Sequence, residues 1–152
     1  MYVHIADEVD LRRCTEASDG TMDFEKNVFP TIVAETDDRE RILGFLSTWV
    51  SGKDVIAGPL WINPNVRGLL RGRVTLAVFE CYEFILRKAG LSYYKAYVPA
   101  HLTRYISLLY RAVDLEPYDM DDNGNLWFER RLDGSSLSQR SAADSAAEPR
   151  RQ

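Results

Sequence analysis

The residues whose types and spacing best suit a chemical role lie between positions 67 and 73, where three arginines and two glycines follow a strand-like segment. Arg67, Arg71 and Arg73 carry planar guanidinium groups that match phosphate oxygens. Gly68 and Gly72 let a backbone approach a ligand closely. A long amphipathic segment starts here, and the free N–H groups at the start of a helix favour an anion. The spacing indicates a phosphate site, and the alternative is a helix start whose arginines face water.

Two further side chains are suited to proton transfer. His101 starts a helical segment and can act as a general base near neutral pH, whereas capping or contact with solvent is the alternative. Glu35 ends a strand and can orient a water or an amine, whereas an exposed strand-end carboxylate is the alternative. Cys81 falls on an apolar helix stripe and is interpreted as core, not as a nucleophile. Trp61 either walls a ligand cleft or packs in the core.

Composition limits the classes of protein that this chain can form. With 152 residues, 45% of them hydrophobic, the chain is long enough for one domain with a core and too short for two. Cys14 and Cys81 have no metal-site spacing, so we expect no metal, and two thiols fit a reducing, cytoplasmic compartment. The acidic N-terminus does not resemble a signal peptide, and no apolar run reaches the roughly 18 residues of a membrane span.

Charge is distributed unevenly along the chain. The net charge is −4, yet residues 67–113 contain eight basic and two acidic residues, whereas residues 114–132 contain two basic and six acidic ones. The positive middle can meet a polyanion. The acidic total and the absence of a nucleic-acid-binding motif argue against a nucleic-acid partner.

Apolar periodicity predicts an alternation of strands and helices. Two apolar runs, 31–34 and 42–50, flank a short charged turn and predict an antiparallel hairpin. The strongest helix, 67–89, repeats apolar residues every three or four positions. Pro59 marks an edge, a bulge or a start within the strand that contains it. The other expected strands cover 2–6, 55–63, 93–98 and 126–132, the last paired near 115–118, and the other helices cover 8–17 and 101–113. This order predicts a mixed α/β sheet with helices on its faces.

The last twenty residues differ from the rest of the chain. From Asp133 onward they include one large apolar residue and are rich in serine, alanine and charge. Such a segment cannot bury enough surface to offset the entropy of ordering. We therefore expect one domain over 1–132 and a disordered tail over 133–152.

Residues 60–73 resemble the acyl-coenzyme A loop of the GNAT acyltransferase superfamily. As in that family, a strand ends in Asn-Pro and leads through Arg-Gly into a long amphipathic helix. The hairpin IVAETDDRERILGFL is similar to the family's second and third strands, and SLLYRAVDLEP is similar to its Leu-Tyr-x-x-x-Gly-Phe segment. The resemblance covers roughly residues 2–132 and implies a mixed, mostly antiparallel sheet flanked by helices on both faces.

The resemblance also implies an activity, the transfer of an acetyl or other acyl group from acetyl-coenzyme A to an amine. The amine attacks the thioester directly, without a covalent enzyme intermediate. Tyr110 stands where the family's tyrosine protonates the departing thiolate, and His101 and Glu35 are the other candidates for catalysis. The residues expected to bind the cofactor are Ile62, Arg67, Gly68, Arg71, Gly72 and Arg73. The acceptor, a small molecule or a protein, is not defined by the sequence, and we expect no membrane partner.

Two departures from the family pattern support a second hypothesis. Leu70 replaces the middle glycine of the phosphate loop, where a side chain can obstruct the pyrophosphate. Asp114 and Leu115 stand where Gly-Phe is usual. In these respects the chain is similar to divergent GNAT-like proteins encoded by tailed bacteriophages. The second hypothesis is therefore a GNAT fold without catalysis that acts as a binding or structural protein.

Overall fold

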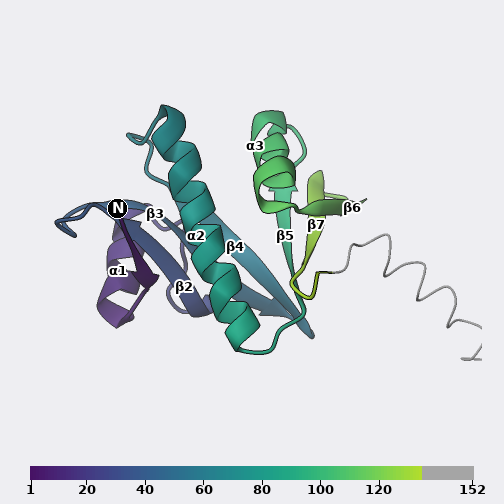
Figure 1. Cartoon of the computed structure of the whole chain (residues 1–152), viewed down its shortest axis with the longest axis horizontal. Coiled ribbons are helices and arrows are strands. Elements are labelled where there is room, and N and C mark those ends of the chain that lie inside the picture. Colours follow the sequence, from purple (N-terminus) through teal and green to yellow (C-terminus); the bar gives the residue numbers. More distant parts are fainter. Residues whose placement is uncertain (135–152) are drawn as a thin grey trace, which may run out of the picture.

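Seven strands form one sheet in the order β1-β2-β3-β4-β5-β7-β6 in the computed structural model, which describes residues 1–134 (Figure 1). All neighbouring pairs are antiparallel except β4 and β5, which are parallel. The strands are β1 (Tyr2–Ile5), β2 (Val28–Glu35), β3 (Ile42–Ser51), β4 (Asp54–Ile62), β5 (Tyr93–Pro99), β6 (Glu116–Met120) and β7 (Asn125–Arg131). The predicted α/β class and the mostly antiparallel sheet are confirmed.

Each helix begins where the local sequence provides a start. Asp7 caps α1 (Glu8–Ala17) in a capping box, since its carboxylate accepts from the Asp10 N–H and the Asp10 carboxylate accepts from the Asp7 N–H. The long helix is α2 (Gly68–Lys88), with Arg87 and Lys88 in its last turn. The expected helix 101–113 is divided between α3 (Thr103–Leu108) and a π-helical turn, η1 (Leu109–Val113).

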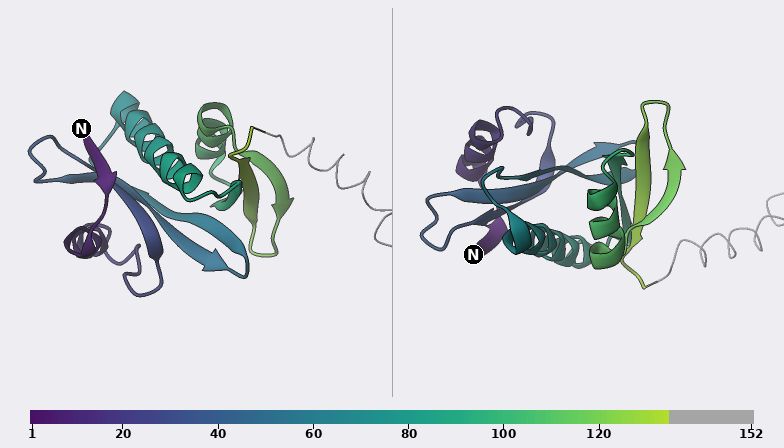
Figure 2. Two further views of the ribbon diagram at one scale, coloured as in Figure 1. Left: turned by 60° about the horizontal axis from the view of Figure 1, so that its bottom comes forward. Right: turned by 90° about the horizontal axis from the view of Figure 1, so that it is seen from above.

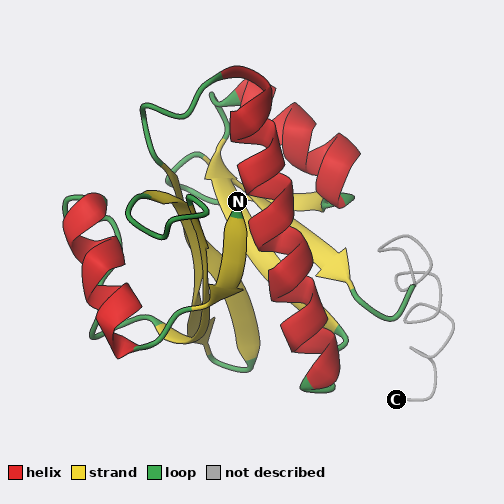
Figure 3. Ribbon diagram, turned by 60° about the vertical axis from the view of Figure 1, so that its left-hand side comes forward, coloured by secondary structure: helices red, strands yellow, loops and turns green. Residues whose placement is uncertain are grey.

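Helices cover both faces of the sheet, as Figures 2 and 3 show. Successive side chains of a strand point to opposite faces, so β2 and β3 contribute to two apolar clusters. On one face α1 packs through Cys14 against Val33 and Phe45. On the other face α2 buries its apolar stripe against strand residues that include Ile32 and Leu46. The burial on both faces explains why β2 and β3 read as almost continuous apolar runs.

Two of the expectations concern the tail and the membrane. Residues 135–152, most of the tail expected to be disordered, lie outside the part of the chain that the structure describes. Within residues 1–134, no helix combines the length and the apolar character needed to cross a membrane.

Candidate active site

The parallel strands β4 and β5 diverge after a short contact. Their ladder contains a single register pair, Ile56 with Lys95. Pro59 follows on β4, and because proline has no N–H, the strand cannot donate a ladder hydrogen bond there. The expected irregularity at Pro59 is confirmed as a register shift between β3 and β4. A cavity of about 990 Å³ lies beside the divergent segment, a volume typical of small-molecule sites.

The N-terminus of α2 opens onto this cavity. A turn leads into the helix, in which the Asn65 N–H donates to Asn63 Oδ1 at 3.0 Å and the Val66 N–H donates to the Asn63 carbonyl at 2.9 Å. Gly68 then adopts a φ of +62°, a left-handed conformation that favours glycine. No side chain caps the first turn. The N–H groups of this turn are therefore available to an anionic ligand.

The structure brings together some of the residues expected to bind a cofactor and separates others. Ile62, Gly68, Arg71 and Gly72 line the cavity. Arg67 lines a separate, shallow depression together with Leu70, and exposed Arg73 lines neither. Leu70 therefore does not lie across the cavity, and the obstruction expected from its side chain is not found there.

Sequence reasoning missed two residues of α3 at the cavity. Arg104 and Tyr105 both contribute to its lining. Burial raises the pKa of the Tyr105 phenol, and the opposing effect of the Arg71 charge does not cancel this rise. Leu102, Tyr105 and Leu109 recur at spacings of three and four along the expected helix 101–113 and so form an apolar stripe, and all three line the cavity. The apolar stripe therefore faces the cavity as well as the core.

The three residues proposed for catalysis from the sequence lie elsewhere. Tyr110 is on the π-helical turn, 56% exposed, and does not line the cavity. His101 is exposed just before α3 and does not line it either. Glu35 ends β2, as expected, but it is completely buried, so the exposed-carboxylate alternative is wrong. The cavity lining is thus assembled without these three side chains.

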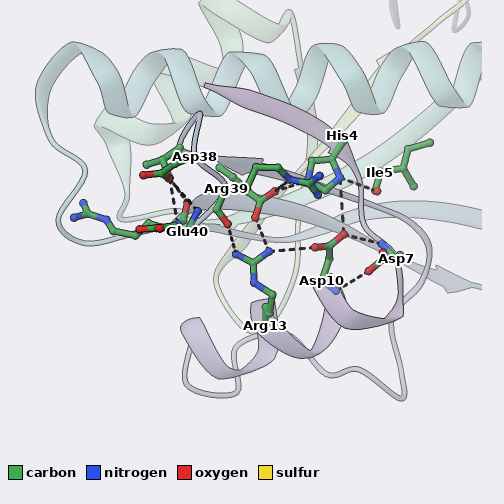
Figure 4. Close-up of polar contacts among 11 residues, drawn as sticks. His4, Ile5, Asp7, Asp10, Arg13, Asp38, Arg39 and Glu40 are labelled. Atoms are coloured by element: carbon green, nitrogen blue, oxygen red, sulfur yellow. Dashed lines mark hydrogen bonds and ion pairs between the residues drawn. The ribbon is translucent and has the colours of Figure 1, made fainter.

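Glu35 is the centre of an ion-pair network with His4 of β1, Arg13 of α1 and Arg39 of the turn after β2. Figure 4 shows these three partners gathered between α1 and the sheet. Arg13 Nη1 donates to Glu35 Oε1 at 2.5 Å, and His4 Nε2 and Arg39 Nε lie 2.6 and 3.3 Å from Oε2. Burial alone raises the pKa of Glu35, but the hydrogen bonds from His4, Arg13 and Arg39 outweigh it and hold the pKa below its usual value. The carboxylate is therefore charged and satisfied.

The same network contains a set of potential metal ligands. One ligand atom from each of His4, Asp10 and Glu35 lies within 4.8 Å of the others. Arg13 Nη1 contacts both carboxylates, at 3.2 Å from Asp10 and 2.5 Å from Glu35. A guanidinium already supplies the positive charge that these oxygens require. We therefore interpret the cluster as an ion-pair network that fixes α1 to the sheet.

Replacing Glu35 by glutamine should lower the free energy of unfolding by about 3 kcal/mol at neutral pH, because it leaves partly buried cations without their counter-charge. A carboxylate with a depressed pKa stabilises the fold above its ordinary value of 4.5 and loses this contribution as the pH falls through the folded-state pKa. The difference between wild type and Glu35→Gln should therefore shrink below about pH 4.5 in urea unfolding experiments.

Glu8→Gln is the matched control, because Glu8 pairs with Arg12 on the surface of α1 and its side chain is 72% exposed. This change should lower the free energy of unfolding by less than about 1 kcal/mol. Equal losses in the two variants would contradict the role given to the buried network.

Trp61 and Cys81 pack in the interior. The Trp61 ring stacks on Phe45 with 5.6 Å between centroids and packs against the cluster under α1. Cys81 is partly buried against the cluster under α2, and burial raises the pKa of its thiol. Neither lines the cavity, in agreement with a packing role.

No protein-family model matches the sequence, and no curated protein matches it. Solved structures do resemble it. The ribosomal-protein-S18-alanine N-acetyltransferase from Escherichia coli has a TM-score of 0.65 at 12% identity, with 90% of this chain and 96% of that chain covered.

Two similar structures contain acetyl-coenzyme A. One is a putative acetyltransferase from Salmonella typhimurium, with a TM-score of 0.67 at 16% identity over 90% of this chain and 96% of that chain. The other is a GNAT superfamily phosphinothricin acetyltransferase from Sinorhizobium meliloti, with a TM-score of 0.67 at 16% identity over 86% of this chain and 88% of that chain. The chain therefore has the GNAT fold, and at these identities the likeness is one of fold.

Proposed function

We propose that this protein is an N-acyltransferase that uses an acyl-coenzyme A thioester, with acetyl-coenzyme A as the simplest donor. The observation that carries the proposal is the cavity where β4 and β5 diverge, next to the uncapped start of α2. Arg71 and Arg104 place two cations at this cavity. The two acetyl-coenzyme A complexes with the same fold support this choice of donor.

The cavity offers separate regions for the parts of such a donor. Its pyrophosphate would accept hydrogen bonds from the first N–H groups of α2 and from Arg71, with Gly68 and Gly72 leaving the approach open. Its amide-containing arm would pair with the β4 backbone up to Ile62, where β5 has moved away. The apolar lining, which includes Phe79, would exclude water from the thioester.

In the proposed reaction the amine nitrogen attacks the thioester carbonyl. A C–N bond forms and the C–S bond breaks, the nitrogen loses a proton, and the thiolate gains one to leave as a thiol. None of the lining residues within 1–134 is Asp, Glu or His, so an ammonium group would lose a proton to water to give the free amine that attacks, and the attacking nitrogen would release its second proton to water as the amide forms. Tyr105 would donate its phenolic proton toward the sulfur, since its raised pKa keeps it protonated.

The alternative of a GNAT fold without catalysis was argued from two departures, Leu70 in the phosphate loop and Asp114-Leu115 in place of Gly-Phe. Because Leu70 lines the separate depression with Arg67, it gives that alternative no support. The resemblance to phage-encoded proteins stays an untested expectation from the sequence, as do the catalytic roles of Tyr110, His101 and Glu35 and the cofactor-binding role of Arg73. The present proposal gives the acid role to Tyr105 and leaves these four residues without a role in the reaction.

Calorimetric titration with acetyl-coenzyme A tests the proposal. We expect the wild type to bind acetyl-coenzyme A. Arg71→Ala should weaken the binding free energy by about 1–3 kcal/mol, the usual value of a hydrogen bond to a charged group. Arg73→Ala is the matched control, since Arg73 lies on the same helix outside the cavity, and its affinity should not change. Absence of binding at high micromolar ligand would overturn the proposed function. An equal loss in both variants would place the donor elsewhere.

A further inference from the structure

The cavity receives side chains from both faces of the sheet. Phe79 of α2 lies on one face. Tyr97, which is 41% exposed, alternates along β5 with buried Ala96 and Val98 and so points to the opposite face. Trp49 shares that opposite face and also lines the cavity. On this side α1 covers β2 and β3, and no helix of residues 1–134 covers β5, β7 or β6 (Figure 2).

Three aromatic rings contact one another in a row on this second face. Tyr97 lies in the middle, with ring centroids 6.3 Å from Trp49 and 4.9 Å from Trp127. The Trp127 indole N–H donates to Asp121 Oδ2 at 2.9 Å, which fixes the ring beside a carboxylate. Hydrogen bonds from the Asn125 backbone and from Trp127 lower the pKa of Asp121, so this group is anionic at neutral pH. A second carboxylate, Asp119, is opposite Trp127 in the ladder.

The two sides of the cavity therefore differ in charge. The lining near α2 and α3 contains Arg71 and Arg104. The carboxylates placed beside the aromatic rings are Asp121, which accepts from the Trp127 indole N–H, and Asp119, which is opposite Trp127 in the ladder. Lys95 is the cation nearest to Tyr97 along β5, and its charge is compensated by Asp54 at 3.0 Å. The face of an aromatic ring attracts cations, and neighbouring carboxylates strengthen the attraction.

We propose that this aromatic face binds the acceptor, and that the acceptor is a small aliphatic compound with a second, protonated amino group. The second ammonium group would lie against Tyr97 and Trp127, while the first amine, as its free base, would reach into the cavity toward the thioester. This inference rests on the proposed function, because it assigns the acceptor of the same reaction. The second ammonium group is a requirement that the reaction alone does not impose, since an amine on an uncharged alkyl chain could be acylated in the same way.

The matched probes are 1,5-diaminopentane and n-pentylamine, which have the same chain length and differ in the second ammonium group. Titration followed by tryptophan fluorescence, without any acyl donor, should show roughly five- to thirty-fold tighter binding of the diamine. Tyr97→Leu should reduce this preference to less than about twofold, whereas Tyr97→Phe, which retains the ring, should preserve most of it. The Phe variant also controls for folding, because Tyr97 is partly exposed and loses only its hydroxyl.

Kinetics with acetyl-coenzyme A then separate the two proposals. We expect kcat/KM to be higher for the diamine by a similar factor and this advantage to disappear in Tyr97→Leu. If both amines are acylated equally well, the proposed function stands and the acceptor assignment is overturned. If the diamine binds preferentially but acetyl-coenzyme A does not bind, the proposed function falls, and the acceptor role falls with it. A diamine preference that survives in Tyr97→Leu would place the cation elsewhere and also overturn the assignment.

Discussion

Tyr105→Phe should lower kcat by about a hundredfold while leaving the KM for the acyl donor nearly unchanged. The phenol lines the cavity, and burial raises its pKa, so it carries a proton throughout the neutral range. The substitution removes this proton but keeps the ring that packs on the cavity wall. General acid catalysis of this kind typically raises the reaction rate 10²–10⁴-fold. The variant still binds both substrates, so it should keep the part of the rate enhancement that comes from binding them together.

Tyr110→Phe is the comparison that distinguishes the two tyrosines. Tyr110 matches the family's pattern, yet it is 56% exposed and outside the cavity lining, so its loss should change kcat by less than about twofold. A donor thioester with a more acidic thiol provides an independent measurement, because its leaving group needs less help from an acid. Such a donor should recover much of the rate lost in Tyr105→Phe. A large loss in Tyr110→Phe, with Tyr105→Phe unaffected, would reverse the assignment.

Gly72→Glu should weaken acetyl-coenzyme A binding by about a hundredfold or more. Gly72 lines the cavity within the first turns of α2, and a Cβ added there meets no atom within 4 Å, so a side chain can extend into the space beside Arg71. A carboxylate at this position would repel the donor's phosphates. At roughly 4 Å and an effective dielectric constant near 20, two like charges cost about 4 kcal/mol, and solvent exposure reduces this value.

Two other substitutions at Gly72 separate charge from bulk and from helix stability. Gly72→Gln has the size of the glutamate without its charge and should lose much less affinity. Gly72→Ala fills open space in a helix and should raise the free energy of unfolding by up to about 1 kcal/mol. Calorimetry for the ligand and urea unfolding for stability provide the two measurements. Equal affinities for the Glu and Gln variants would contradict the presence of phosphates near this helix start.

Much of the fold could be predicted from local patterns. The charged turn between two apolar runs defined the β2–β3 hairpin, which pairs Val33 with Phe45. The pairing of strand 126–132 with residues near 115–118 was also predicted, and it is present between β6 and β7. These elements depend on short-range turns and on side-chain alternation, both of which can be read directly from the order of residues.

The candidate site was only partly predictable, for reasons that differ from residue to residue. Gly68, Arg71 and Gly72 were found because the start of a helix concentrates their features in one short segment. Arg67 and Arg73 were grouped with them by proximity in sequence, but neither lines the cavity. Arg67 precedes the helix as its extended N-cap residue and lines the separate depression, and Arg73 lies at another position around the helix axis.

The sequence by itself determined the order of the elements, the helix start with its glycines and arginines, and the apolar stripe that includes Tyr105. The tertiary structure decided which of these residues meet. The cavity exists because β4 and β5, about forty positions apart, pair only at Ile56 and Lys95 and then separate. The tertiary structure also decided that the charge of Glu35 is neutralised by arginines from two other segments. Contacts of this kind depend on long-range packing, which leaves no periodic signal in the sequence.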